Sequence, residues 1–163
     1  MNKNDLRIGT KLVLVTAMTR LDYNIYRGWE LPENEDGSDK GQLVEDIDGG
    51  ESNHSEHEGY ISWSPQDVFD AAYKASGEMT FGMAIEAAKR GYKVARTGWS
   101  GSGMFAYIVP ANSYPAQTEA IKDEFADDMI PYREYWALKT AQNDVATWSP
   151  SGSDSLANDW GIV

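Results

Sequence analysis

Short apolar runs, separated by polar and glycine-containing stretches, predict an N-terminal half built mainly from strands. Three runs have the length and composition of strands, and the alternation is clearest in the third. They are residues 11–16, 42–47 and 60–63. After the first run, Thr19 has the side chain of an N-cap and Gly28 the freedom of a C-cap. We therefore predict a short helix between them, followed by an acidic loop over residues 32–41.

A second helix is predicted directly after the third strand. Ser64 has the side chain of an N-cap, Pro65 suits the first helical position, and Asp67 places an acid in the first turn. The segment that precedes this strand, residues 51–59, is strongly polar and follows a turn at residues 48–50. We expect this segment to be a solvated, mobile loop.

The second half opens with a strongly signalled helix. Thr80 is a suitable N-cap, Gly91 ends the pattern, and four apolar residues between them recur at the spacing of one helix face. These residues are Phe81, Ala84, Ile85 and Ala88. The strands predicted after this helix are 92–96, 104–109, 135–140 and 145–148, with a short strand near the C-terminus. The last two numbered strands form a predicted hairpin.

Residues 111–131 are less regular, and only an acidic helical piece around 119–128 is predicted there. Together the elements predict an α+β fold, a mostly antiparallel sheet with covering helices, preceded by a small α+β N-terminal module. The acidic excess ends near residues 75–78, where a new helix begins. We therefore expect one module in residues 1–78 and a second in residues 79–163.

The chain of 163 residues has the composition of a globular protein, and its net charge limits the classes of partner that it can bind. No apolar run approaches the roughly 20 residues of a membrane span and no secretory leader is recognisable, so we expect a cytoplasmic protein without membrane association. The net charge is −12, divided into −9 for residues 1–78 (7 basic, 16 acidic) and −3 for residues 79–163 (7 basic, 10 acidic). This acidity disfavours DNA and RNA, because their binding depends on lysine and arginine neutralising phosphates.

The residue types present argue against most catalytic chemistries. The chain has no cysteine, which excludes disulfides, thiolate zinc sites and cysteine nucleophiles. Its two histidines, His54 and His57, lie three apart among acids, a pattern that also occurs in divalent-metal sites. The flanking glycines and the lack of an evident third ligand favour a solvated loop instead. We expect no enzymatic activity, no metal and no cofactor.

The loop at residues 97–103, Thr-Gly-Trp-Ser-Gly-Ser-Gly, is the leading candidate site. Its glycines permit positive φ and close approach of a ligand, and successive N–H groups in such a turn can form an anion-binding nest. The spacing is neither a dinucleotide fingerprint nor a P-loop. Two interpretations stay open: the loop holds an anion while Trp99 stacks on a base, or it is a tight connection with Trp99 in the core. The residues alone favour the second slightly.

Two further features admit a binding role beside an ordinary structural one. Arg96 precedes the loop and can pair bidentately with phosphate, or be a surface arginine on a strand. The polar loop 148–154 offers hydroxyls and a carboxylate to a ribose or a base edge, or is a serine-rich turn in which Ser153 caps a helix. Most of the six tryptophans belong in the core or an interface, and one or two are expected to be available for base stacking.

The C-terminal module resembles the Thoeris anti-defense 2 family of phage proteins. The motifs that carry the resemblance are Thr-Phe-Gly at 80–82, Val-Ala-Arg at 94–96 and Gly-Trp-Ser-Gly-Ser-Gly-Met-Phe at 98–105. Later matching positions are Tyr114-Pro115, 139–141, Trp148, 154–156 and Asp159-Trp160. The pattern departs from the family at Ser100, near Asn143 and at Gly152-Ser153. The N-terminal module resembles a small module of other phage proteins, to which we attach no function.

The resemblance implies a sponge, a phage protein that binds and sequesters a cyclic ADP-ribose-type immune signal without cleaving it. It also implies a homotetramer with pockets at subunit contacts, and cyclic di- or trinucleotides as further ligands. The ligand-binding residues expected are Phe81, Arg96, Trp99, Gly103, Met104, Trp148, Ser151 and Asp154. The alternative is an inhibitor of a host nuclease, of the anti-CRISPR type, because an acidic surface can mimic nucleic acid.

Overall fold

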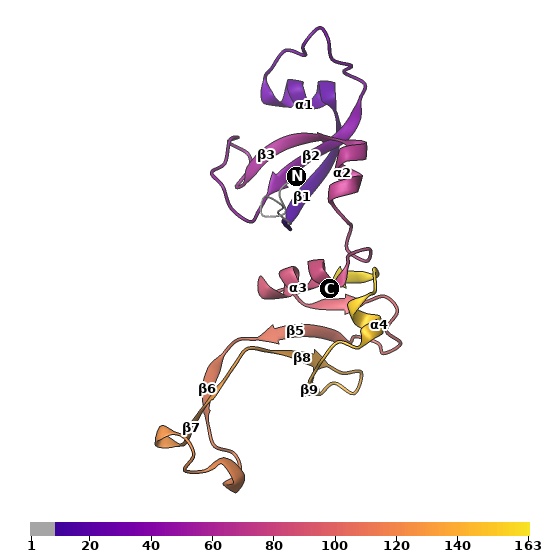
Figure 1. Ribbon diagram of the computed structural model, residues 1–163. Coiled ribbons are helices and arrows are strands. Elements are labelled where there is room, and N and C mark those ends of the chain that lie inside the picture. The colour runs from indigo at the N-terminus through magenta and orange to yellow at the C-terminus, as the bar shows by residue number, and fades with distance from the viewer. Residues whose placement is uncertain (1–8) are drawn as a thin grey trace, which may run out of the picture. The chain divides into compact units, whose positions relative to one another are not determined.

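The computed structural model describes residues 9–163, which divide between an N-terminal unit that ends at residue 74 and a C-terminal unit that starts at residue 75 (Figure 1). Both units combine helices with sheets, and every strand pair in residues 9–163 is antiparallel. The predicted α+β class is therefore confirmed. Within the same residues, no helix has both the length and the apolar character that crossing a bilayer requires.

The N-terminal unit is a three-stranded sheet with one helix after its first strand and another after its third. Its strands are β1 (Val13–Thr19), β2 (Lys40–Asp46) and β3 (Tyr60–Pro65), in the spatial order β1-β2-β3. Its helices are α1 (Arg20–Arg27) and α2 (Gln66–Ala72). The register places Val15 opposite Val44, and Val44 opposite Ser62. The strand β2 is thus central, and β1 and β3 are both edges.

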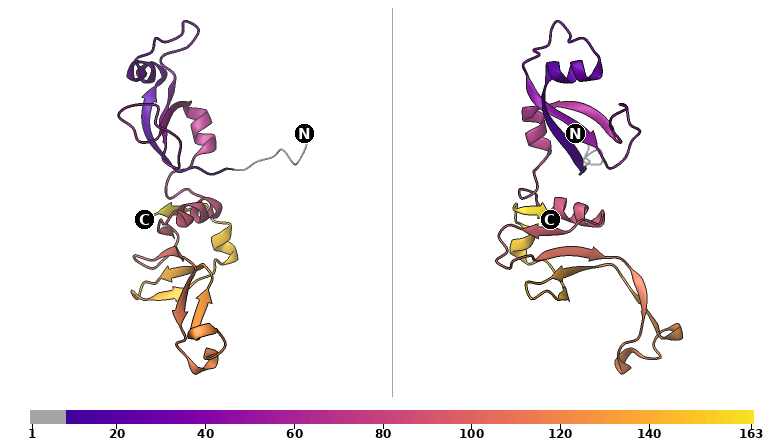
Figure 2. Two further views of the ribbon diagram at one scale, coloured as in Figure 1. Left: turned by 90° about the vertical axis from the view of Figure 1, so that its left-hand side faces the viewer. Right: turned by 180° about the vertical axis from the view of Figure 1, so that it is seen from behind.

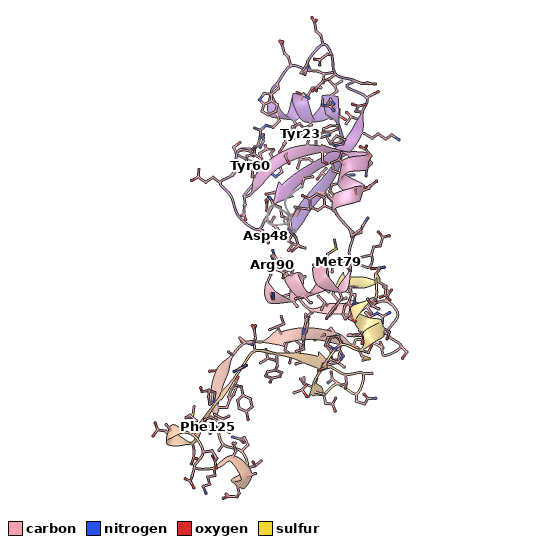
Figure 3. All side chains as sticks on the ribbon, viewed as in Figure 1. Tyr23, Asp48, Tyr60, Met79, Arg90 and Phe125 are labelled. Carbon is pink, nitrogen blue, oxygen red and sulfur yellow. The ribbon has the colours of Figure 1, made fainter. Side chains whose placement is uncertain are left out.

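The short helix α1 begins and ends at the predicted residues. The Thr19 hydroxyl accepts a hydrogen bond from the Asp22 N–H at 3.1 Å, and Gly28 closes the helix with a φ of 70°. The helix directs Tyr23 into the core of the unit, where it packs with Leu43 and Ile61. Figure 3 shows Tyr23 between α1 and the sheet. Local capping therefore fixes the position of the residue that closes this small core.

The helix α2 begins one residue later than the sequence predicts. Pro65 has a φ of −54° and a ψ of 146°, which places it at the N-cap rather than in the first helical position, and no side chain caps the helix. Ser64 pairs with Gln42 in the sheet, and its hydroxyl lies 3.4 Å from the Pro65 carbonyl. The predicted serine cap is therefore wrong, because sheet pairing holds Ser64 in the strand.

The polar segment 51–59 packs against the sheet through side-chain hydrogen bonds. The Glu45 carboxylate accepts from the Gly59 N–H at 2.9 Å and lies 2.7 Å from His57 Nδ1. Both contacts hold the pKa of Glu45 below its usual value. The other ring nitrogen of His57 lies 2.9 Å from the Tyr26 hydroxyl. Five of the nine residues of this segment are exposed, as expected for a solvated loop. Glu45 and Tyr26, which are distant in sequence, also tie the loop to the sheet and to α1.

The C-terminal unit is built on a five-stranded antiparallel sheet. Its strands, in the spatial order β10-β4-β5-β8-β9, are β4 (Val94–Arg96), β5 (Phe105–Val109), β8 (Tyr135–Lys139), β9 (Val145–Thr147) and β10 (Trp160–Ile162). Its helices are α3 (Phe81–Lys89) and α4 (Gly152–Ser155). The predicted hairpin is confirmed, since β8 pairs with β9.

The core of this unit lies between α3 and one face of the sheet. Thr80 caps α3 as predicted, accepting a hydrogen bond from the Met83 N–H at 3.3 Å. Alanines on the inner face of α3, among them Ala84, pack against Val94 and Trp160 on the sheet, and all three residues are fully buried. Small side chains on the helix bring it close to the strands and leave room for the large indole of Trp160.

An arm extends from the five-stranded sheet where the sequence predicts little regular structure. The strands β6 (Asn112–Pro115) and β7 (Met129–Tyr132) form a two-stranded sheet between β5 and β8 (Figure 2). The acidic piece between them consists of two short 3₁₀ turns, Glu119–Ile121 and Ala126–Asp128, rather than a longer helix. Aspartates with positive φ interrupt any longer helix there, at 123, 127 and 128.

Replacing Gly41 by alanine is expected to destabilise the N-terminal unit. A Cβ at this position of β2 would lie 2.5 Å from the Trp63 ring and would overlap the Ser64 carbonyl oxygen. Trp63 cannot move away freely, because its indole N–H donates to the Met18 carbonyl at 2.9 Å. We expect a loss of roughly 1–3 kcal/mol, the usual cost of overpacking, measured by urea unfolding.

The matched control is Gly9→Ala, because no atom lies within 4 Å of a Cβ at Gly9. Equal unfolding midpoints for the two variants would contradict the close approach of Trp63 to β2.

Candidate functional site

The centre of the candidate site is an arginine shared between two aspartates. Arg96, at the end of β4, donates from its Nη1 to Asp154 Oδ1 at 2.9 Å and from its Nε to Asp159 Oδ1 at 2.8 Å. The side chains of Arg96 and Asp154 are only 19% and 13% exposed. Both ion pairs join β4 to the C-terminal segment around α4. The Arg96 guanidinium therefore already has anionic partners within the C-terminal unit.

Asp154 holds this arrangement together through both of its carboxylate oxygens. Oδ2 accepts from the Ser151 hydroxyl at 2.7 Å and from the Ser151 N–H at 3.0 Å, which completes a capping box at α4. Oδ1 accepts from the Trp99 indole N–H at 3.2 Å as well as from Arg96. Burial alone would raise the pKa of Asp154, but the hydrogen bonds from Ser151, Arg96 and Trp99 outweigh it and lower the pKa to about 2.

Five aromatic side chains pack together beside this ion-paired centre. Trp160 is fully buried and donates its indole N–H to the Asp154 carbonyl at 3.0 Å. Around it the rings meet mostly edge to face, with the centroids of Trp99 and Trp160 5.3 Å apart and those of Trp99 and Trp148 5.8 Å apart. Phe81 and Trp136 complete the cluster. Trp99 thus lies partly buried in the aromatic core, with its indole N–H bonded.

Hydrogen bonds fix the first half of the glycine-rich loop 97–103. The backbone N–H groups of its second half have no acceptor within the described residues. The Gly98 N–H donates to Asp159 Oδ2 at 2.9 Å, and the Trp99 N–H to the Arg96 carbonyl at 3.2 Å. No acceptor in residues 9–163 is hydrogen-bonded to the N–H groups of residues 100–103. Gly103 has a φ of 68°, which few other residues adopt readily. The second half of the loop therefore offers consecutive backbone donors.

A pocket of about 250 Å³ lies beside β5, lined by Ala88 and Gly91 at and just after the end of α3 as well as by residues of β5, β8 and β9. Lys139 and Phe105 stand directly opposite each other in β8 and β5, and Tyr107 follows Phe105 on the same face. Lys93 reaches over the Phe105 ring, with its Nζ 5.0 Å from the ring centroid. The Lys139 Nζ donates to the Gly103 carbonyl at 3.2 Å, so the pocket adjoins the glycine-rich loop.

The structure brings together most of the residues that the sequence singles out. Six of them surround the ion-paired centre and the aromatic cluster: Phe81, Arg96, Trp99, Trp148, Ser151 and Asp154. Gly103 lies beside the pocket, because its carbonyl accepts from the pocket residue Lys139, whereas the Met104 side chain lies against Gly101 and does not line the pocket. The helix cap assigned to Ser153 belongs to Ser151, because it is the Ser151 hydroxyl that accepts from the Asp154 N–H, at 3.1 Å.

Sequence reasoning misses the residues that line the pocket. Phe105 and Tyr107 lie in β5, Lys139 lies in β8 and Lys93 directly precedes β4, and only their alternation with core residues such as Ala106 marks them as sharing a face. Neither lysine forms an ion pair with a carboxylate in the described part of the chain. Both are therefore available to an anionic ligand.

The groups of this site are of kinds that can hold a ligand. With a pKa of about 2, Asp154 stays ionised near neutral pH and does not act as a proton donor there. Residues 9–163 contain no group of three or more histidines and acids placed to hold a metal ion. What the site offers instead is backbone donors, two lysines and aromatic rings.

Comparison with known proteins shows the family to which the chain belongs. Residues 79–163 match the model of the Thoeris anti-defense 2-like domain, and the chain belongs to that family. Over 86 residues it is 34% identical to a protein of Bacillus phage SP01 named Thoeris anti-defense 2. That match covers 53% of this chain and 96% of the phage protein. The chain is thus a member of a phage anti-defense family, and the family resemblance of the C-terminal module is confirmed.

Replacing Asp154 by asparagine is expected to destabilise the C-terminal unit, because the neutral amide leaves Arg96 and the α4 cap with a weaker partner. We expect a loss of about 3 kcal/mol at pH 7. Asp154 has a lowered pKa in the folded state, so its contribution is present above its ordinary pKa of 3.8 and is lost as the pH falls towards 2. Hydrogen exchange of peptides from residues 75–163 measures the difference in stability between wild type and Asp154→Asn from pH 7 down to pH 2.

The control for this measurement is Glu119→Gln, since the Glu119 side chain is 89% exposed and its ion pair with Lys122 is a surface one. If the difference in stability between wild type and Asp154→Asn stayed constant from pH 4 to pH 2, the charge of Asp154 would not be what stabilises the unit.

Proposed function

We propose that the C-terminal unit binds and sequesters a cyclic nucleotide immune signal, of the cyclic ADP-ribose type, without cleaving it. Membership of a phage anti-defense family supports a role against a bacterial defence. Cyclic di- or trinucleotides are further candidate ligands, because they share the same chemistry of phosphates joined to aromatic bases. No step of this role requires a catalyst, since trapping the signal is sufficient.

The observation that carries the proposal is the pocket with two unpaired lysines beside the unused donors of the glycine-rich loop. A pyrophosphate would accept hydrogen bonds from the N–H groups of residues 100–103 and neutralise Lys93 and Lys139. A base would lie against the rings of Phe105 and Tyr107. The two kinds of contact lie on adjoining parts of one surface, as a cyclic nucleotide requires.

The eight residues proposed from the sequence divide into two roles in this arrangement. Gly103 is bonded to the pocket residue Lys139 and Met104 directly precedes Phe105, and we propose that both contact the ligand directly. The other six form the ion-paired centre and the aromatic cluster that hold the loop: Phe81, Arg96, Trp99, Trp148, Ser151 and Asp154. Because their polar groups are already bonded to one another, we propose that they position the loop.

A sequestering protein returns its ligand unchanged. Cyclic ADP-ribose incubated with the full-length protein and released by heat denaturation is expected to be intact by mass spectrometry, and its amount to match the binding sites. Cleaved product would identify the protein as a hydrolase.

Variants of the pocket test where the ligand is held. The double substitution of Lys93 and Lys139 by methionine removes two charges from the pocket, and we expect at least a tenfold weaker affinity for cyclic ADP-ribose, about 1.4 kcal/mol. The control is Lys122→Met, because Lys122 lies in the arm and forms a surface ion pair with Glu119. Equal affinities of the two variants would place the ligand elsewhere.

The arm supports the homo-oligomer that we propose, a tetramer with pockets at subunit contacts. An isolated two-stranded sheet is only marginally stable in water, and this one exposes several apolar side chains. They include Tyr114 and Tyr132, each 45% exposed, and Phe125, 40% exposed. Figure 3 shows Phe125 in the distal part of the arm. A second copy of the chain would cover these side chains.

Disrupting the apolar surface of the arm is expected to lower the oligomeric state. We expect native mass spectrometry to find a tetramer for the wild type and smaller species for the double variant Phe125→Ser with Met129→Ser. The control is Leu156→Ser, which removes a side chain that is 83% exposed and lies outside the arm. A tetramer that survives the arm substitutions would show that other surfaces hold the copies together.

A second candidate function, inhibition of a host nuclease by direct binding, is favoured by the net charge of −9 in residues 1–78. A basic nucleic-acid groove would attract such a surface. Co-purification with Cas9 at moderate salt, in the absence of any cyclic nucleotide, would support this second function over sequestration.

A further inference from the structure

The two edge strands of the sheet in the N-terminal unit, β1 and β3, differ in how well they are protected from pairing with another chain. On β3, the Asn53 side chain imitates a neighbouring strand: its Nδ2 donates to the Ile61 carbonyl at 2.9 Å, and its Oδ1 accepts from the Ile61 N–H at 2.8 Å. Pro65 ends the same strand with a residue that lacks a backbone N–H. These are devices that keep an edge strand from pairing with another chain.

The edge at β1 has no such protection within residues 9–163. The Ile47 N–H donates to the Leu12 carbonyl and the Arg20 N–H to the Asp39 carbonyl, so even-numbered residues of β1 make the bonds to β2. The odd-numbered residues Val13, Val15 and Ala17 consequently turn their N–H and C=O groups outward.

The side chains along this edge are apolar and accessible. Leu14 is 57% exposed and Val15 is 47% exposed, and successive residues of a strand point to opposite faces of the sheet. An edge of seven residues with apolar side chains on both faces and unpaired backbone groups is a template for strand addition.

The charge pattern of this edge permits a second copy of the chain to pair with it. Residues 12–19 carry no charge, although the module they belong to has a net charge of −9. The lysine that precedes them, Lys11, forms an ion pair with Asp46 of the neighbouring strand, which holds its charge on its own sheet. A second copy of this chain could approach here without bringing its acidic side chains into the contact.

A two-fold axis through Val15 gives the antiparallel pairing that keeps charges out. It sets Val13 opposite Ala17, Leu14 opposite Thr16 and Leu12 opposite Met18, all uncharged. An axis through Thr16 would instead set Leu12 opposite Arg20, which begins α1 and has left the strand. The axis through Val15 lets the outward groups of Val13, Val15 and Ala17 make two hydrogen bonds in each of three pairs.

We propose that the outer edge of β1 pairs with β1 of a second copy of this chain, antiparallel and centred on Val15, to make one continuous six-stranded sheet from two N-terminal units. The contact uses no residue of the nucleotide pocket or of the arm. It therefore stands or falls independently of sequestration.

Cysteine cross-linking tests both the contact and its register, because the chain has no cysteine of its own. In the proposed pairing the two Val15 residues lie directly opposite each other, with Cα atoms about 5.5 Å apart, a separation that a disulfide spans. Full-length Val15→Cys is expected to form a covalent dimer on mild oxidation, seen on a non-reducing gel. Val13→Cys or Ala17→Cys alone is expected to stay monomeric on the gel, whereas a mixture of the two is expected to cross-link.

The control for random collisions is Ile25→Cys, at a side chain on α1 that is 65% exposed. Cross-linking of Val15→Cys no stronger than that of Ile25→Cys would overturn the proposal, and efficient cross-linking of Val13→Cys alone would overturn its register. A second variant, Val15→Lys, sets two like charges opposite each other and is expected to remove this contact in native mass spectrometry. Its affinity for cyclic ADP-ribose is expected to equal that of the wild type. A Val15→Lys protein with unchanged assembly would also overturn the proposal.

Discussion

The buried carboxylate of Asp154 is the interaction on which the C-terminal unit depends. One oxygen closes the α4 capping box at Ser151, and the other receives Arg96 and the Trp99 indole. The backbone carbonyl of the same residue receives the Trp160 indole. Transferring a charged carboxylate from water into the protein interior costs free energy, and several hydrogen-bond donors together offset that cost. A single residue thus connects β4, the glycine-rich loop, α4 and the aromatic core.

This connection explains why the glycine-rich loop can serve a ligand without containing a free arginine. Arg96 looks like a phosphate-binding residue in the sequence, but its guanidinium is already ion-paired with both Asp154 and Asp159. Those bonds fix the first half of the loop, and Asp159 also accepts from the Gly98 N–H. A loop held in this way keeps its remaining N–H groups in place before any ligand arrives, which lowers the entropic cost of binding.

Local signals in the sequence predict most of the elements, and long-range pairing accounts for what they miss. Thr19 and Thr80 cap their helices as predicted, because capping involves only the next three residues. The partners of Glu45 and the strands of the arm depend on residues far along the chain, and no local pattern reports them. The candidate site divides in the same way. The loop and its tryptophan are visible as a motif, whereas Lys93 and Lys139 become neighbours only when three strands align.

The acidic chain can still bind the anionic ligand that we propose. Repulsion by the net charge acts over long distances, whereas hydrogen bonds and ion pairs in the pocket act at short range. A net charge of −12 repels an anion at long range, and salt screens that repulsion beyond about 8–10 Å. Within hydrogen-bond distance, unpaired lysines and oriented N–H groups act without screening by intervening water. Asp154 and Asp159 share the single positive charge of Arg96, and their oxygens also accept hydrogen bonds from Ser151 and Gly98. An anion in the pocket would therefore meet donors rather than carboxylates, while the distant acids would slow its approach more than they weaken its binding.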